Sequence, residues 1–267
     1  MDLAVEVVPG IEPGLLERVV ERLVGLEPGA VAILVAGSYA KGVADERSDL
    51  DLIVAREGEP ACPYRMWFEE RTGRAPLHVS PSWRTVDRCV GERGEPEDWA
   101  LGFPVHNVTK YVWASEAGRA ALGDPPDYVH PAAEPELEDF VEFVGKVLRC
   151  TRRGDSIGVR AFAREAAALA PGLLRTLNAE TVVRDRREAV EAARSLKVAP
   201  KNYREDFEIT LGLVAADDET VERSAVRLGR ELLAFLREHN PNADSQPDIA
   251  RYLADGTLER HLGFFDS

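Results

Sequence analysis

The sequence has little cysteine and no long apolar run, and each scarcity excludes a class of protein. The three cysteines, Cys62, Cys89 and Cys150, are odd in number and scattered, with no pairing pattern or metal-binding spacing. This usage favours a reducing compartment, so a cytoplasmic location is expected. No apolar stretch approaches the roughly 20 residues of a transmembrane helix, and the N-terminus lacks the basic start and apolar stretch of a signal peptide.

Positive charge is also scarce. Acidic residues outnumber basic ones by 47 to 33, which gives a net charge of −14. This balance argues against broad, non-specific binding to nucleic acid or to anionic membranes, although a local basic patch remains compatible with it. The chain of 267 residues, with 45% hydrophobic residues, is long enough to build one large or two modest globular domains.

The most informative stretch runs from residue 31 to residue 54. An apolar run over 31–36 ends at Gly37-Ser38, and after a gap of ten residues a second apolar run over 49–54 contains Asp49 and Asp51. The pattern predicts a strand, a tight turn, a short helical excursion and a second strand. Because alternate residues of a strand share a face, both aspartates are expected on one face, about 7 Å apart.

Two carboxylates on one strand face repel each other, so they form a poor structural pair. They suit a divalent cation instead, since Mg²⁺ prefers hard oxygen ligands and often bridges carboxylates to substrate phosphates. Gly37 lets the backbone approach a phosphate closely, and Ser38 offers a hydroxyl and a backbone N–H. Together these residues indicate phosphoryl or nucleotidyl transfer. The alternative is a strand-turn-strand unit with two aspartates that face solvent.

Gly37-Ser38, the ten-residue gap and Asp49-Leu50-Asp51-Leu52 resemble the motif of the polymerase-β-like nucleotidyltransferase superfamily. Ser48 also matches the common Ser-Asp-hydrophobic-Asp form of that motif. The resemblance implies metal-dependent transfer of a nucleoside monophosphate from an NTP to an acceptor hydroxyl. Gly37, Ser38 and Ser48 would then bind the nucleotide, and Asp49 and Asp51 would hold Mg²⁺ or Mn²⁺.

Lys41 and Arg47 lie in the segment between the two halves of the motif. Either residue can neutralise a triphosphate. Both can equally be loop charges that balance Asp45 and Glu46. We list Lys41 with the nucleotide-binding residues and leave the two interpretations open.

A third strand is expected over 75–81, with His78 and Ser80 on one face. The superfamily usually keeps a third carboxylate on this strand, and here His78 occupies that place. A neutral histidine can accept a proton from an acceptor hydroxyl, but it is a poor oxygen-type ligand for Mg²⁺. Three alternatives follow: His78 is the base, a third acid comes from elsewhere, or the site binds nucleotide without turnover. A histidine that only hydrogen-bonds within the sheet is the structural alternative.

Helical and extended patterns divide the chain near residue 130. A helix is expected over 13–26, a short helix over 64–72, another over 85–91 and a fourth strand over 103–115. From residue 134 the apolar period is helical almost throughout, with helices expected over 134–148, 156–177, 184–196 and 220–239. We therefore predict an α+β nucleotidyltransferase domain with a small mixed sheet over 1–130, and an all-α helical bundle over 131–267.

This layout resembles the small-molecule, aminoglycoside-type nucleotidyltransferases, in which a helical domain forms the acceptor side of the cleft. The resemblance implies an enzyme that uses an NTP and a small-molecule acceptor, with catalytic residues Asp49, Asp51 and His78, and with nucleic acid and membrane not expected as partners. In that group a carboxylate of the helical domain can serve as the base, and Glu138, Glu142 and Glu165 are possible suppliers. The alternative is a nucleotide-binding regulatory or partner protein of the same fold without turnover.

Overall fold

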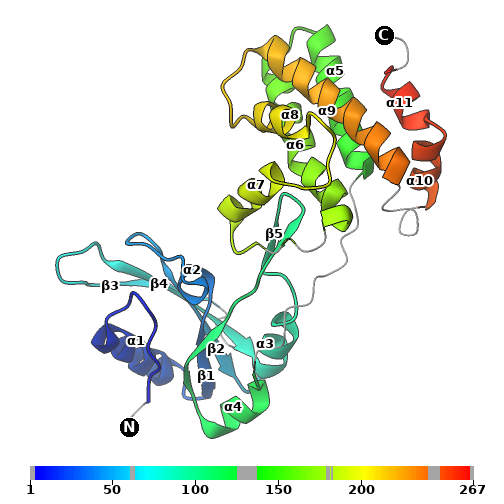
Figure 1. Ribbon diagram of the computed structural model, residues 1–267. Coiled ribbons are helices and arrows are strands. Elements are labelled where there is room, and N and C mark those ends of the chain that lie inside the picture. Colours follow the sequence, from blue (N-terminus) through cyan, green and yellow to red (C-terminus); the bar gives the residue numbers. More distant parts are fainter. Residues whose placement is uncertain are drawn as a thin grey trace. The chain divides into compact units, whose positions relative to one another are not determined.

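The computed structural model describes residues 4–60, 64–124, 137–178, 181, 183–239 and 247–264, except for the side chains of 247–249. Its internal contacts divide the chain into two compact units (Figure 1). The first unit contains residues 1–98 and 106–129, and the second contains 99–105 and 130–267. The α+β class with a small mixed sheet and a helical C-terminal region is confirmed. The assignment of a catalytic domain to 1–130 and an acceptor-side domain to 131–267 stays a prediction.

The first unit is built on a five-stranded sheet with the strand order β3-β4-β2-β1-β7. β2 and β4 are parallel, and the other neighbouring pairs are antiparallel. The elements of this unit are α1 (Pro13–Leu26), β1 (Ala30–Val35), α2 (Gly37–Lys41), β2 (Leu50–Arg56), β3 (Trp67–Glu69), β4 (Leu77–Thr85), α3 (Val86–Glu92), β7 (Lys110–Ala114) and α4 (Glu116–Leu122).

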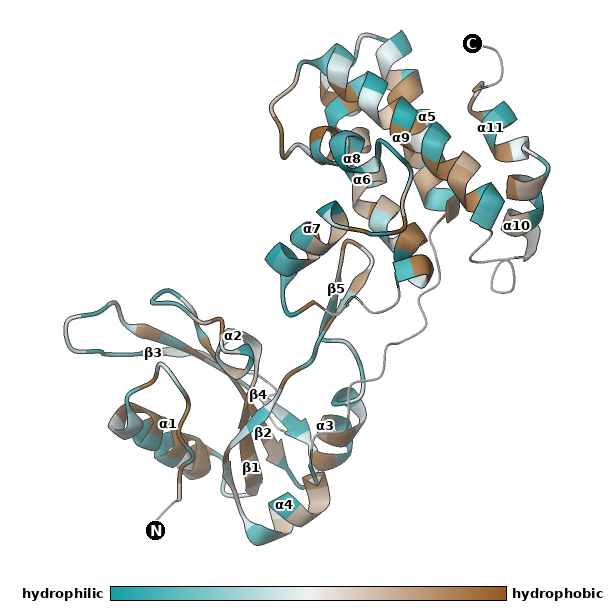
Figure 2. Cartoon of the chain, viewed as in Figure 1, coloured by the Kyte–Doolittle hydropathy of each residue, from teal (hydrophilic) through white to brown (hydrophobic). Residues whose placement is uncertain are grey.

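Both faces of this sheet carry apolar rows, and β1 is coloured largely as hydrophobic in Figure 2. On one face α1 buries five apolar side chains, each contributing roughly 1.5–3 kcal/mol, against a row that includes Leu50, Leu52 and Val54. On the other face, Ile53 and Ala55 pack with residues of α3 and α4. Since side chains alternate along β2, Asp51 belongs to this second face.

Two expected elements of the first unit were wrong. Residues 64–72 do not form a helix: Trp67–Glu69 is strand β3, which pairs with the edge of β4. The expected strand over 103–115 is two strands, β6 (Phe103–Val105) and β7. β6 pairs with β5 (Asp98–Ala100) in a separate two-stranded sheet. β6 belongs to the second unit, and its Val105 bridges to Val183 of the same unit. Pairing with other strands therefore determined the secondary structure of both segments, and their local sequence pattern did not.

The second unit is helical. Its helices are α5 (Leu137–Arg152), α6 (Ser156–Leu174), the 3₁₀ helix η1 (Arg175–Asn178), α7 (Arg186–Arg194), α8 (Tyr203–Leu211), α9 (Asp218–His239), α10 (Pro247–Ala254) and α11 (Thr257–His261). Their apolar faces share one core, which includes Phe140, Leu173, Phe207 and Leu232. Asp155 caps α6 by accepting a hydrogen bond from Gly158 N–H at 2.9 Å. α8 was not predicted as a helix.

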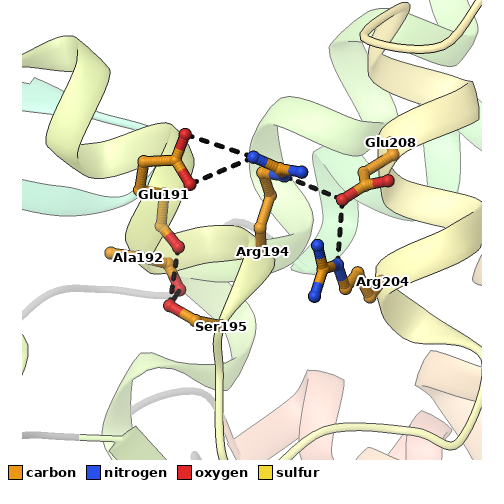
Figure 3. Close-up of polar contacts among 6 residues, drawn as sticks. All are labelled: Glu191, Ala192, Arg194, Ser195, Arg204 and Glu208. Atoms are coloured by element: carbon orange, nitrogen blue, oxygen red, sulfur yellow. Dashed lines mark hydrogen bonds and ion pairs between the residues drawn. The ribbon is translucent and has the colours of Figure 1, made fainter.

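Ion pairs join α7 to α8 on the surface of this unit (Figure 3). Arg194 donates through Nε to Glu208 Oε1 at 2.7 Å, and Arg204 donates to the same oxygen at 2.9 Å. These pairs lower the pKa of Glu208, chiefly through the hydrogen bond from Arg194. Among the helices described here, none is both long and apolar enough to cross a membrane.

Candidate active site

Asp51 lies where the buried part of β2 gives way to a cavity. Ile53 and Ala55, on the same face, are buried under α3 and α4, whereas Asp51 is half-buried and lines a cavity of about 510 Å³. Its two neighbours in the strand, Leu50 and Leu52, are fully buried on the opposite face. The sheet therefore fixes the direction of the Asp51 side chain, as alternation predicted.

Gly37 packs directly against the Asp51 carboxylate. A Cβ at this position would collide with Asp51 Oδ2 and would lie 3.2 Å from its Cγ. The backbone of Gly37 has a φ of 60°, which favours glycine. The preceding residue, Ala36, donates its N–H to the carbonyl of Asp51 at 2.9 Å. The structure thus brings together the two halves of the Gly-Ser and Asp-Leu-Asp motif.

His78 lies beside Asp49. β2 and β4 run parallel, with Leu50 opposite Val79. Asp49 and His78, which directly precede these two residues, are therefore neighbours as well. The distance from His78 Nδ1 to Asp49 Oδ2 is 3.7 Å. The His78 ring also stacks on Phe68 of β3, with 5.1 Å between the ring centroids.

The second nitrogen of His78, Nε2, is buried and has no hydrogen-bond partner among the described residues. A histidine retained only to hydrogen-bond within the sheet would place this atom on a partner. The observed contacts of His78, Asp49 on one side and the Phe68 ring on the other, therefore give no support to that structural alternative. The role of His78 as a base stays a prediction.

Negative charge predominates in the cavity. Of the described residues that line it, Asp51, Glu92, Glu95 and Glu97 carry carboxylates, and Arg84 carries positive charge. Arg84 and Arg88 both form ion pairs with Glu92. Burial, followed by the charges of Asp49 and Glu97, raises the pKa of Asp51 to about 6, and His78 and Lys41 offset only part of this rise.

The other predicted nucleotide-binding residues have different surroundings. The Ser38 hydroxyl oxygen is buried and has no hydrogen-bond partner among the described residues. The Lys41 side chain is only 6% exposed and forms an ion pair with Glu97. Ser48 closes the turn before β2, where its Oγ accepts from Asp45 N–H at 2.9 Å. Ser48 thus stabilises a local turn. Ser38 and Lys41 differ from it, because their polar groups are buried next to the Gly-Ser motif.

The donor set fits Mg²⁺ or Mn²⁺. The carboxylate of Asp51 is half-buried, close to further carboxylates and packed against Gly37, where a Cβ would leave it no room. Hard oxygen donors with excess negative charge are what such cations require. Within the described part of the chain, however, no group of three or more His, Cys, Asp or Glu side chains converges as a complete metal site. Asp49 and Asp51 can each offer a carboxylate, whereas the adjacent positions of β4, His78 and Ser80, offer none.

The second unit has a cavity of its own, of about 540 Å³. It lies between η1 and the segment that links α7 to α8, and its lining includes Thr176, Asn178, Ser195 and Lys197. Asn178 shapes it: its side-chain oxygen accepts from Lys197 N–H and Val198 N–H at 3.1 Å each. The lining mixes hydroxyl, amide and ammonium groups with apolar side chains, which suits a polar small molecule.

Sequence reasoning assigned no role to several residues of the first cavity, among them Ser80, Tyr64 and Glu97. Ser80 and Tyr64 contact each other through their hydroxyl oxygens at 3.2 Å. Strand alternation placed Ser80 on the face of His78 but did not identify it as a residue of the site. Glu97 had no local signal, because it lies in a charged, glycine-containing loop and its partner Lys41 is far away in the sequence.

Comparison with known proteins gives an independent view of the family. Residues 136–236 match the family model described as "Nucleotidyltransferase, substrate binding domain". A solved structure of a nucleotidyltransferase-like protein from Exiguobacterium sibiricum 255-15 is similar with a TM-score of 0.39 and 12% identity, over 83% of this chain and 74% of that chain. A search of curated proteins found no match. Residues 136–236 are therefore similar to the substrate-binding domains of nucleotidyltransferases, which agrees with the resemblance that the Gly-Ser and Asp-Leu-Asp motif indicated.

Proposed function

We propose that this protein transfers a nucleoside monophosphate from an NTP to a hydroxyl of a small-molecule acceptor. The family match supports nucleotidyl transfer as the class of reaction. The observation that carries the proposal is the packing of Gly37 against Asp51, with Asp49 and His78 beside them. A glycine backbone, two carboxylates and a potential base therefore lie near one another where β1 ends and where β2 and β4 begin, which supports the proposal.

Each of these residues has a proposed role. Asp49 and Asp51 hold a divalent cation, and Gly37 and Ser38 bind the phosphates. When bound, the cation neutralises charge on the transferring phosphoryl group. His78 accepts the proton of the acceptor hydroxyl at Nδ1, the nitrogen that faces Asp49. The acceptor oxygen then forms a bond to the α-phosphorus, and the bond from that phosphorus to the pyrophosphate breaks.

The substrate-binding family of residues 136–236 supports a small-molecule acceptor. The cavity beside Asn178 is a candidate place for it, because hydroxyl and amide groups line it and such groups recognise a polar acceptor. The net charge of −14 counts against nucleic acid as the acceptor.

The test is an assay of pyrophosphate release with each of the four NTPs, Mg²⁺ and a panel of hydroxylated small molecules. The proposal expects acceptor-dependent release by the wild-type protein and none by Asp51→Asn. Release that is unchanged in Asp51→Asn would refute it.

A second candidate is nucleotide binding without turnover, as in a regulatory protein of the same fold. The observation in its favour is that β4 carries His78 and Ser80 on the site face, with no acid at either position. Its distinguishing result is tight binding of Mg-NTP with no pyrophosphate release for any acceptor.

A further inference from the structure

The loop that follows α3 brings a carboxylate to the cavity that the sequence did not assign. Arg93, which is 7% exposed, anchors the start of this loop by donating through Nη1 to the carbonyls of Leu122 and Gly123 at 2.8 and 2.9 Å. Four residues later, Glu97 lines the same cavity as Gly37 and Asp51. The loop is therefore fixed at one end and presents an acid at the other.

In the described part of the chain, Glu97 forms an ion pair with the ammonium group of Lys41. Lys41 is the last residue of α2, the short helix that begins at Gly37. The Lys41 side chain is 6% exposed, whereas that of Glu97 is 40% exposed. A nearly buried lysine requires a negative partner, because an ammonium group removed from water without one is costly. Glu97 supplies that charge in this structure.

Glu97 also shares its cavity with Asp51. Both side chains line it, together with Gly37 at the start of α2. Glu97 therefore contacts Lys41 and lines the same cavity as the carboxylate of Asp51. Glu95, two residues earlier, lines the cavity too, but in the described part of the chain it forms no ion pair with Lys41.

We propose that Glu97 is the third acidic group of the site: it neutralises Lys41 while the phosphate position is empty, and it joins Asp51 at the divalent cation when an NTP phosphate replaces it on Lys41. The inference rests on the proposed function. It accounts for two observations together, namely the lack of an acid at His78 and Ser80 on β4 and the pairing of Lys41 with an acid of the cavity.

The exchange is electrostatically balanced. Without nucleotide, the positive charge of Lys41 meets one carboxylate, and the phosphates of an NTP offer it a larger negative charge. Once released, Glu97 adds negative charge beside Asp51 and Asp49, where a divalent cation is attracted. The cation and the nucleotide should therefore bind cooperatively. A phosphate on Lys41 frees Glu97 for the cation, and a cation that holds Glu97 leaves Lys41 free for the phosphate.

Calorimetric titration tests this with two probes, ATP in EDTA and ATP with saturating Mn²⁺, on wild type, Glu97→Gln and Glu95→Gln. Glu95→Gln is the matched control, since it removes the same charge from the same loop. In Glu97→Gln we expect metal-free ATP affinity to rise severalfold, because Lys41 is no longer neutralised. The gain in ATP affinity on addition of Mn²⁺ should fall about tenfold in this variant, because the cation loses a ligand. Lys41→Met should weaken ATP binding in both conditions.

The inference is overturned if Glu97→Gln and Glu95→Gln behave alike with both probes. Loss of the Mn²⁺-dependent gain in ATP affinity in Asp51→Asn but not in Glu97→Gln would overturn the inference and leave the proposed function standing. Wild-type protein that binds ATP neither with nor without the cation would overturn both.

Discussion

Two aspartates, one in each unit, are removed from water with opposite surroundings. Asp206 of α8 is 0% exposed, and Arg227 of α9 holds its carboxylate with two hydrogen bonds of 2.6 and 2.7 Å. Asp51 of β2 is half-buried, and the charges of Asp49 and Glu97 add to the effect of burial on its pKa. Burial is the largest cause that raises the pKa of each. Arg227 counteracts it at Asp206, whereas like charges reinforce it at Asp51.

The difference separates a structural carboxylate from a functional one. A buried charge with a bidentate partner joins two helices, and removal of the partner is expensive. A half-buried charge beside other carboxylates costs stability and persists when it serves a ligand, which in the proposed function is a divalent cation. Substitutions at the two sites should therefore act on different properties of the protein.

The largest effect is expected on activity. Asp51→Asn should reduce nucleotidyl transfer by about a thousandfold or more, because a bound divalent cation contributes several kcal/mol at a phosphoryl transition state. Arg227→Met should leave transfer by the folded protein near the wild-type rate. The measurement is pyrophosphate release at saturating Mg-NTP, and equal rates for Asp51→Asn and wild type would contradict the distinction.

The next effect is on stability in the second unit. Arg227→Met leaves Asp206 as a buried carboxylate without its partner, so the free energy of unfolding should fall by about 3–5 kcal/mol at pH 7. Because burial already raises the pKa of Asp206, the carboxylate becomes protonated as the pH falls, and the loss should shrink at acidic pH. Urea denaturation at pH 7 and at a series of lower pH values measures it.

Arg223→Met on the same helix is the control. Arg223 contacts Glu219 at 3.8 Å, and both side chains are largely exposed. An exposed pair of this kind contributes little, so the control should unfold like wild type. A loss equal to that of Arg227→Met would show that α9 tolerates no substitution of this kind.

A smaller effect is expected when alanine replaces Gly37, and Gly42, which also has a positive φ, provides the comparison. Gly37 and Gly42 have φ values of 60° and 72°, so an alanine costs roughly 1–2 kcal/mol at either position. At Gly37 the added Cβ also collides with Asp51, whereas at Gly42 nothing lies within 4 Å. Gly37→Ala should therefore weaken Mg-NTP binding about tenfold or more, since Asp51 must move. Gly42→Ala should bind normally in the same titration.

The smallest effect is a dependence of stability on pH. The pKa of Asp51 rises from 3.8 in the unfolded chain to about 6 in the folded protein, so between these values the folded state binds more protons. Its contribution to stability is present below about pH 4 and is lost as the pH rises through about 6. In EDTA, Asp51→Asn should therefore melt at a higher temperature than wild type at pH 8 and at a similar temperature at pH 4. A lower melting temperature at pH 8 would contradict the comparison.

The sequence predicted the parts of this molecule that depend on local order. Alternation placed Asp51 opposite the buried Leu50 and Leu52, and helical spacing predicted α1 over Pro13–Leu26. β3 was missed because it forms only by pairing with β4, as Phe68 does with His78. Pairing between distant segments is not written in local periodicity.

The candidate site shows the same limit. The glycine and the two aspartates came from one contiguous motif, so their meeting was predictable. Glu97 meets Lys41 through the anchor of Arg93 on Leu122, and no spacing in the sequence indicates that contact. The sequence left two interpretations of Lys41, a phosphate ligand or a loop charge balanced by Asp45 and Glu46. The observed partner of Lys41 is Glu97, an acid of the cavity.

The central claim is that Asp49 and Asp51 hold a divalent cation for an NTP, and calorimetric titration tests it most directly. ATP, GTP, CTP and UTP are each titrated with Mg²⁺ into wild type and into Asp49→Asn/Asp51→Asn. The double variant Glu17→Gln/Glu21→Gln removes the same charge from the exposed face of α1 and serves as the control. The account predicts metal-dependent binding of at least one NTP by wild type and by the control, and its loss in Asp49→Asn/Asp51→Asn. Equal binding by all three proteins, or no binding of any NTP by wild type, would contradict it.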